Sequence, residues 1–231
     1  MYQDHNAAPV NPLPKVLIIL CVALAAAEPF LMLRKLGFLG GVAGLDGRSA
    51  LLQDFFLPAG LLQAMLEAGD FSPQYLSRFI SYIFVDGSLI GTIFALVFIL
   101  AFGNFVARAF APWRFLVIFF ASVLTGGLVY NVLALMIGYG GVLAGGMPGA
   151  FGLIGAFTWL MWTGILRHPI GATNPFALIL FLVIFRVASA PVFGWDWTTV
   201  ADWTGFATGF GLCFLLVPGG AAHILEKLRR R

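Results

Sequence analysis

Charged residues are scarce in this sequence. Of its 231 residues only 10% are charged and 61% are apolar, and the mean hydropathy is +0.97. A soluble domain carries about 25% charged residues, so a soluble fold of this composition would expose more apolar surface than such proteins tolerate. The sequence therefore excludes a soluble enzyme and a disordered protein. The net charge of +3 is too small to indicate a nucleic-acid partner.

Cysteine and histidine are also scarce. The two cysteines, Cys21 and Cys213, lie in apolar runs, and the three histidines, His5, His168 and His223, lie outside them. Two separated cysteines exclude a disulfide framework, and these residues have no spacing typical of a zinc site. We expect no metal and no cofactor. A serine hydrolase needs a base within hydrogen-bond reach of its hydroxyl, and no apolar run contains a histidine that would supply one.

Long apolar runs are abundant. A membrane-spanning helix needs about 20 apolar residues. Six runs are long enough, at residues 16–33, 79–106, 115–137, 147–166, 175–193 and 198–217. The sequence therefore predicts an all-α polytopic membrane protein, with six transmembrane helices in a single membrane domain at residues 16–217.

The connection between the first two runs, residues 36–78, is much longer than the others. It opens with a glycine-rich stretch and then shows helical periodicity from Ser49, a typical N-cap. Pro58 should interrupt this helix. Because Gln53 and Glu67 provide a polar face, we expect an interfacial helical loop between helices 1 and 2, dipped into the outer leaflet.

The distribution of lysine and arginine predicts the orientation. With six spans both termini lie on one side, which would hold Lys15, Arg108, Arg114, Arg167, Lys227, Arg229, Arg230 and Arg231. The other side would hold Arg34, Lys35, Arg48 and Arg78. By the positive-inside rule we expect residues 1–15 and the basic tail 218–231 to be cytoplasmic. The short termini and the absence of a transit peptide favour a bacterial inner membrane.

Glycines follow a pattern in two of the runs. The fourth run opens at Gly145 and Gly146 and continues through Gly152 and Gly155. In the sixth run Gly205 and Gly209 are four residues apart and share one helix face. Such glycines allow two helices to approach closely. We expect the fourth and sixth spans to pack against each other beside a cavity.

Other polar and aromatic residues have structural interpretations. Asn131 in the third run predicts an interhelical hydrogen bond. Trp159 and Trp162, near the end of the fourth run, predict interface anchors. Arg186, within the fifth run, needs a carboxylate or a water-filled cavity as its partner.

Four segments together resemble the rhomboid family of intramembrane serine proteases. They are residues 78–88 (RFISYIFVDGS), Phe102-Gly103-Asn104, Gly145-Gly146-Met147-Pro148 with Gly152 and Gly155 below, and Asp202-x2-Gly205-x3-Gly209. The resemblance covers residues 78–217 in matching order. It implies a six-helix rhomboid-like bundle with a long loop after the first span. It also implies a cavity beside the fourth and sixth spans, whose candidate lining residues are Asp86, Met147, Arg186, Asp202 and Trp203.

The residues that carry the family's reaction are replaced. By resemblance the nucleophilic serine falls on Met147 or Pro148, and the catalytic histidine falls on Asp202. The second-span positions that carry the first histidine and the oxyanion-hole histidine and asparagine fall on Asp86, Gly91 and Ala95. The resemblance therefore implies a member of the family without its catalytic residues.

Three functions remain open. A pseudoprotease would bind transmembrane segments of client membrane proteins without cleaving them. An active intramembrane endopeptidase would use Asp86 and Asp202 as an aspartyl pair, or a serine at a position other than those given above. A transporter or channel would use Glu28, Asp86, Arg186 and Asp202, but the sequence shows no inverted repeat. We favour the pseudoprotease, with client segments and bilayer lipid as its partners.

Overall fold

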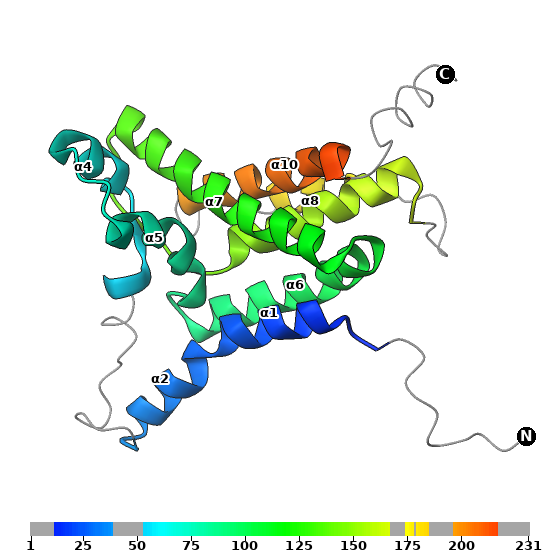
Figure 1. Cartoon of the computed structure of the whole chain (residues 1–231), viewed down its shortest axis with the longest axis horizontal. Helices are drawn as coiled ribbons and strands as arrows, with labels where there is room; N and C mark the ends of the chain where they lie inside the picture. The colour runs from blue at the N-terminus through cyan, green and yellow to red at the C-terminus, as the bar shows by residue number, and fades with distance from the viewer. Residues whose placement is uncertain (1–11, 39–52, 167–173, 178, 185–195, 217–231) are drawn as a thin grey trace, which may run out of the picture.

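The computed structural model describes residues 12–38, 53–166, 174–177, 179–184 and 196–216 (Figure 1). Its elements are α1 (Lys15–Ala25), α2 (Ala27–Lys35), β1 (Leu57–Pro58), α4 (Leu61–Ala68), α5 (Pro73–Ser81), the 3-10 turn η1 (Tyr82–Phe84), α6 (Leu89–Ala109), α7 (Pro112–Ile137), β2 (Val142–Leu143), α8 (Met147–Thr163) and α10 (Thr198–Leu216). The described chain is thus mostly helical.

Several of these helices are long and apolar enough to cross a membrane. Within the described residues there are four such spans: Lys15–Leu33, Leu89–Ala109, Pro112–Ile137 and Thr198–Leu216. The prediction of an all-α polytopic membrane protein is confirmed. Of the other two predicted spans, 147–166 corresponds to the 17-residue α8, and 175–193 lies only partly within the described residues.

The first span is interrupted. α1 ends at Ala25, α2 begins at Ala27, and Figure 1 shows the two helices running in different directions. Pro29 explains the break, because a proline removes a backbone donor and its ring clashes with the carbonyl four residues earlier, which here is that of Ala25.

The predicted start of the second span at residue 79 is wrong. Residues 73–81 form the separate helix α5, and α6 begins only at Leu89. The Asp86-Gly87-Ser88 turn separates them: Asp86 Oδ1 accepts a hydrogen bond from the Ser88 amide at 3.1 Å. The Ser88 hydroxyl in turn accepts from the Gly91 amide at 3.0 Å and caps α6. These turn and capping hydrogen bonds therefore separate α5 from α6, although both helices lie in one continuous apolar run.

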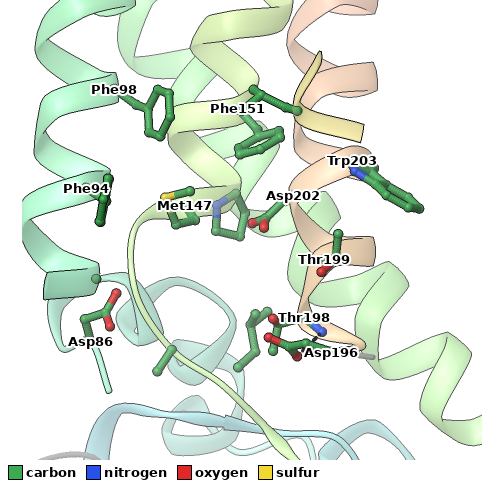
Figure 2. Close-up of a pocket in the computed structure, with 15 residues that line it drawn as sticks. Asp86, Phe94, Phe98, Met147, Phe151, Asp196, Thr198, Thr199, Asp202 and Trp203 are labelled. Carbon is green, nitrogen blue, oxygen red and sulfur yellow. Dashed lines mark hydrogen bonds between the residues drawn. The ribbon is translucent and has the colours of Figure 1, made fainter. Parts of the chain in front are cut away.

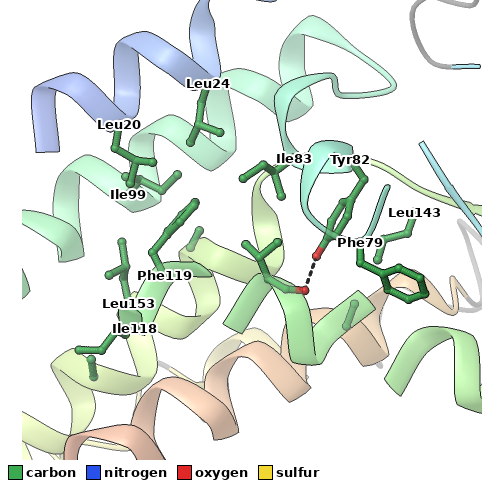
Figure 3. Packing of buried hydrophobic residues seen from close by; sticks show 14 of the residues in the cluster. Leu20, Leu24, Phe79, Tyr82, Ile83, Ile99, Ile118, Phe119, Leu143 and Leu153 are labelled. Atoms are coloured by element: carbon green, nitrogen blue, oxygen red, sulfur yellow. Dashed lines mark hydrogen bonds between the residues drawn. The ribbon is translucent and has the colours of Figure 1, made fainter. Parts of the chain in front are cut away.

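α8 lies at the centre of the bundle and contacts α6, α7 and α10. Most of its residues are buried, as expected for a helix that is apolar on all sides. Figure 3 shows the adjoining core, where Leu153 and Ile118 lie near Phe119. Trp159 was predicted at the membrane interface, but it is 1% exposed and packs on Phe214. That prediction is wrong because α8 is enclosed by its neighbours along its length.

The loop between the first two spans is anchored to the bundle. Leu57 and Pro58 of β1 pair antiparallel with Leu143 and Val142 of β2, just before α8. The Leu62 amide donates to Asn131 Oδ1 of α7 at 3.1 Å, so Asn131 bonds between elements as predicted. The predicted break at Pro58 takes the form of β1, and the predicted N-cap Ser49 lies outside the described residues.

Candidate functional site

A cavity of about 490 Å³ opens where the starts of α6, α8 and α10 meet (Figure 2). Three carboxylates line it, those of Asp86, Asp196 and Asp202. Its apolar walls come mainly from the aromatic residues Phe94, Phe98, Phe151 and Trp203. The site is therefore an acidic pocket with an aromatic wall, at the end of the bundle where α8 begins.

The first turn of α8 forms one wall of this cavity. Met147 is half-buried and Pro148 is buried, and both line the cavity. Proline is favoured in the first turn of a helix, because a backbone N–H at that position would have no intrahelical acceptor; Pro148 occupies this position in α8. Neither a thioether nor a pyrrolidine ring can attack a carbonyl carbon, so these two side chains provide packing surface and no nucleophile.

Asp202 lies one turn inside α10 and is half-buried. Figure 2 shows its carboxylate directed towards the start of α8, while the indole of Trp203 extends to the other side of α10. Burial, and after it the negative charge of Asp202, raise the pKa of Tyr82 well above its ordinary value. Tyr82 is thus held neutral, and its hydroxyl donates to the Val123 carbonyl at 2.8 Å.

Asp86 precedes α6 and lies against two glycines. A Cβ atom on Gly91 or on Gly145 would overlap the Asp86 carboxylate. Gly145 also has φ +93°, a conformation that favours glycine. Asp86 falls within the predicted run 79–106 but lies outside the helix, because α6 starts three residues after it. The space that a side chain at position 91 would need is instead filled by the Asp86 carboxylate.

Small residues bring α8 and α10 into backbone contact. A Cβ on Gly205 would overlap the Pro148 carbonyl, one on Gly209 the Gly152 carbonyl, and one on Gly155 the Phe206 carbonyl. These glycines set the distance between the helices that carry Met147 and Asp202. By contrast Gly146 is in ordinary contact with Ala95, so it does not belong to this seam.

The comparison with protein families finds a match to the Rhomboid domain over residues 73–219. The chain belongs to the rhomboid family. The match begins at α5 and runs through α10, so it contains the whole cavity and the glycine seam. A comparison with curated proteins finds no match to this chain.

The cavity of this rhomboid domain lacks the groups of a serine protease among the described residues. No serine, histidine or lysine of the described chain lines it, and its hydroxyls are those of Thr198 and Thr199. Ser122 lies near α8 but outside the cavity: it is fully buried, and a Cβ on Gly152 would overlap its hydroxyl. His5, His168 and His223 all lie outside the described residues.

The two predicted intramembrane acids come from different elements. Figure 2 shows the Asp86 carboxylate beside the start of α6 and the Asp202 carboxylate on α10, on either side of the chain that leads into Met147. An aspartyl pair that shares one proton needs its carboxyl groups about 3 Å apart. Arg186, the predicted partner of these acids, lies outside the described residues.

Asp196 is a cavity residue that the sequence analysis missed. Its Oδ1 accepts from the Thr198 amide at 2.9 Å, at the start of α10. Burial and the charge of Asp196 raise the pKa of Tyr139 to about 12. The signal was present as Asp-x-Thr before an apolar run, a typical helix start. Among the described residues no cluster of three potential ligands could hold a metal ion.

Proposed function

We propose that this rhomboid domain is a pseudoprotease, which binds transmembrane segments of client membrane proteins in the Met147–Asp202 cavity and does not cleave them. The observation that carries the proposal is the first turn of α8. There Met147 and Pro148 face the cavity, and the described lining residues include no serine, cysteine, histidine or lysine.

The cavity suits an apolar segment that carries a polar or basic group. Phe94, Phe98 and Phe151 offer apolar surface, and Asp196 and Asp202 offer carboxylates beside it. A helix held there would place its apolar side chains on the aromatic wall. A cation or backbone amide near the end of the bound helix would face the carboxylates of Asp196 and Asp202. The low polarity of the cavity would strengthen the electrostatic attraction between them.

We also place this domain in a bacterial inner membrane with both termini cytoplasmic. The support is the lysine and arginine distribution, since Lys15, Arg108 and Arg114 lie at the end of the bundle opposite to the cavity. On this orientation the cavity opens near the outer face of the membrane and receives client segments at that depth.

The proposal is tested by site-specific photo-crosslinking in membranes together with a cleavage assay. A photo-reactive residue at Met147 should capture client membrane proteins at full length. The matched control is the same residue at Val97, which is on α6, 54% exposed and outside the cavity. Capture at Val97 equal to that at Met147 would contradict client binding in the cavity.

The second arm uses a fluorophosphonate probe and a model transmembrane substrate, beside an active rhomboid protease. We expect neither labelling nor cleavage. Labelling would contradict the absence of a serine nucleophile. Cleavage without labelling, abolished in both Asp86→Asn and Asp202→Asn, would instead support the aspartyl alternative.

A further inference from the structure

A second cavity lies on the outside of the bundle, away from the acidic pocket. It is a groove of about 590 Å³ between α1 and α7, with α6 behind it. Val16, Ile19 and Ala23 of α1 form one side, and Leu116 and Phe120 of α7 form the other. Apart from Lys15, the lining is apolar. Its volume is within the roughly 300–1,000 Å³ that small-molecule sites occupy.

Positive charge gathers at one end of this groove. Lys15 lines it. Arg108 follows the lining residue Ala107, and its Nη2 donates to the Pro12 carbonyl at 2.8 Å, which ties a second cation to the same end.

Negative charge is at the other end of the bundle. The acidic pocket lies where α6, α8 and α10 begin, whereas Arg108 lies near the end of α6. The described acidic residues all lie at or beyond the end of the bundle that holds the pocket: Glu28, Asp54, Glu67, Asp70, Asp86, Asp196 and Asp202. No described carboxylate is therefore available at the mouth of the groove, and an anion there must come from outside the described chain.

The depth of the groove matches one leaflet of a bilayer. From Lys15 to Ala23 on α1, and from Pro112 to Phe120 on α7, the rise is about 12 Å at 1.5 Å per residue. Half of a hydrocarbon core is about 15 Å. Phe84 of η1 also lines the groove. A single acyl chain that enters beside Lys15 would therefore lie along the groove within one leaflet.

We propose that this groove binds one anionic phospholipid, with an acyl chain between α1 and α7 and the headgroup phosphate at Lys15 and Arg108. The apolar walls account for the chain, and the Lys15 ammonium and the Arg108 guanidinium account for the phosphate. This site is separate from the Met147–Asp202 cavity and does not depend on the proposed pseudoprotease function.

Native mass spectrometry of the full-length protein tests the proposal. The protein is incubated with an equimolar mixture of phosphatidylglycerol and phosphatidylcholine that carry identical chains. We expect preferential retention of one phosphatidylglycerol. Lys15→Gln and Arg108→Gln should each lower that preference about fivefold, since a cation near an anionic headgroup is worth about that factor. Ala23→Phe should abolish retention of both lipids by filling the groove.

Two variants are matched controls. Val22→Phe adds the same ring on the neighbouring α1 position, which is 64% exposed and does not line the groove. Arg78→Gln removes a cation from α5, at the opposite end of the bundle. Both should retain phosphatidylglycerol as the parent does. If Ala23→Phe does not fold, the variants that remove a cation at the groove still test the proposal. Equal retention of the two lipids, or equal loss in Arg78→Gln and Lys15→Gln, would overturn the proposal.

Discussion

At the scale of single residues, substitution of Met147 tests whether a serine protease site can be restored in this cavity. Met147→Ser would place a hydroxyl in the first turn of α8, but no histidine or lysine of the described residues lines the cavity to act as its base. We therefore expect Met147→Ser to stay unlabelled by a fluorophosphonate, like its control Met147→Ala. Labelling of the serine variant alone would show that a carboxylate activates it.

Gly91 and Asp86 share one space, so their substitutions should be coupled. A Cβ at Gly91 overlaps the Asp86 carboxylate, whereas nothing lies within 4 Å of a Cβ at Gly87. We expect Gly91→Ala to lower the free energy of unfolding by about 1–3 kcal/mol. In Asp86→Ala/Gly91→Ala that loss should be smaller than the sum of the single losses.

Unfolding by titration with SDS, followed for the four members of this cycle, measures the coupling, with Gly87→Ala as the control. Additive losses would mean that the Asp86 side chain is not what excludes a larger residue at position 91.

At the scale of whole elements, the seam between α8 and α10 is the feature on which the cavity depends. Gly209 meets the Gly152 carbonyl, and Gly211, two residues further along α10, has nothing within 4 Å of a Cβ. We expect Gly209→Ala to lower the free energy of unfolding by about 1–3 kcal/mol. Gly211→Ala should be neutral or slightly stabilising, because alanine is the better helix former.

Thermal unfolding of both variants in detergent separates these outcomes. Client capture at Met147 is measured on the same preparations, since a wider seam moves Met147 away from Asp202. Equal melting temperatures for Gly209→Ala and Gly211→Ala would contradict close backbone contact between the two helices.

Elements differ in how far the sequence could predict them. The four-residue spacing of Gly205 and Gly209 was enough to place both on one face, but their partner carbonyls depend on how α8 docks. The turn at residues 86–88 interrupts an apolar run that a hydropathy window reads as continuous, so the start of α6 was misplaced. Trp159 was misassigned for a related reason, because sequence position does not reveal that α8 is enclosed by its neighbours.

The site was predictable in part. Met147, Asp202 and Trp203 line the cavity together with Asp86, although they come from three separate segments, and the order of the family's motifs was what linked them. Asp196 and the wall of Phe94, Phe98 and Phe151 carried no such motif. Apolar side chains in a membrane helix are equally suited to lipid, core or cavity, so only packing distinguishes them.

At the scale of the whole molecule, charge divides the bundle into two ends. Lys15, Arg108 and Arg114 lie at one end, and the carboxylates of the acidic pocket lie at the other. Arg34 and Lys35 follow the first span and oppose this division. The orientation of the protein in the membrane therefore depends on which group of cations has the greater effect. The end that holds Lys15, Arg108 and Arg114 has more cations in total, but Arg34 and Lys35 favour the opposite orientation.

Topology reporters in a bacterial host test this balance. We expect a cytoplasmic signal from a reporter fused before residue 1 and from one fused after residue 231, and an external signal from one inserted at Gly140, in the connection between α7 and α8. Signals from the three reporter positions distinguish two errors in the predicted topology. An external signal from both termini, with an internal one at Gly140, would mean that Arg34 and Lys35 dominate. A cytoplasmic N-terminus with an external C-terminus would mean an odd number of spans, and the fault would then lie in the fifth predicted span, at residues 175–193.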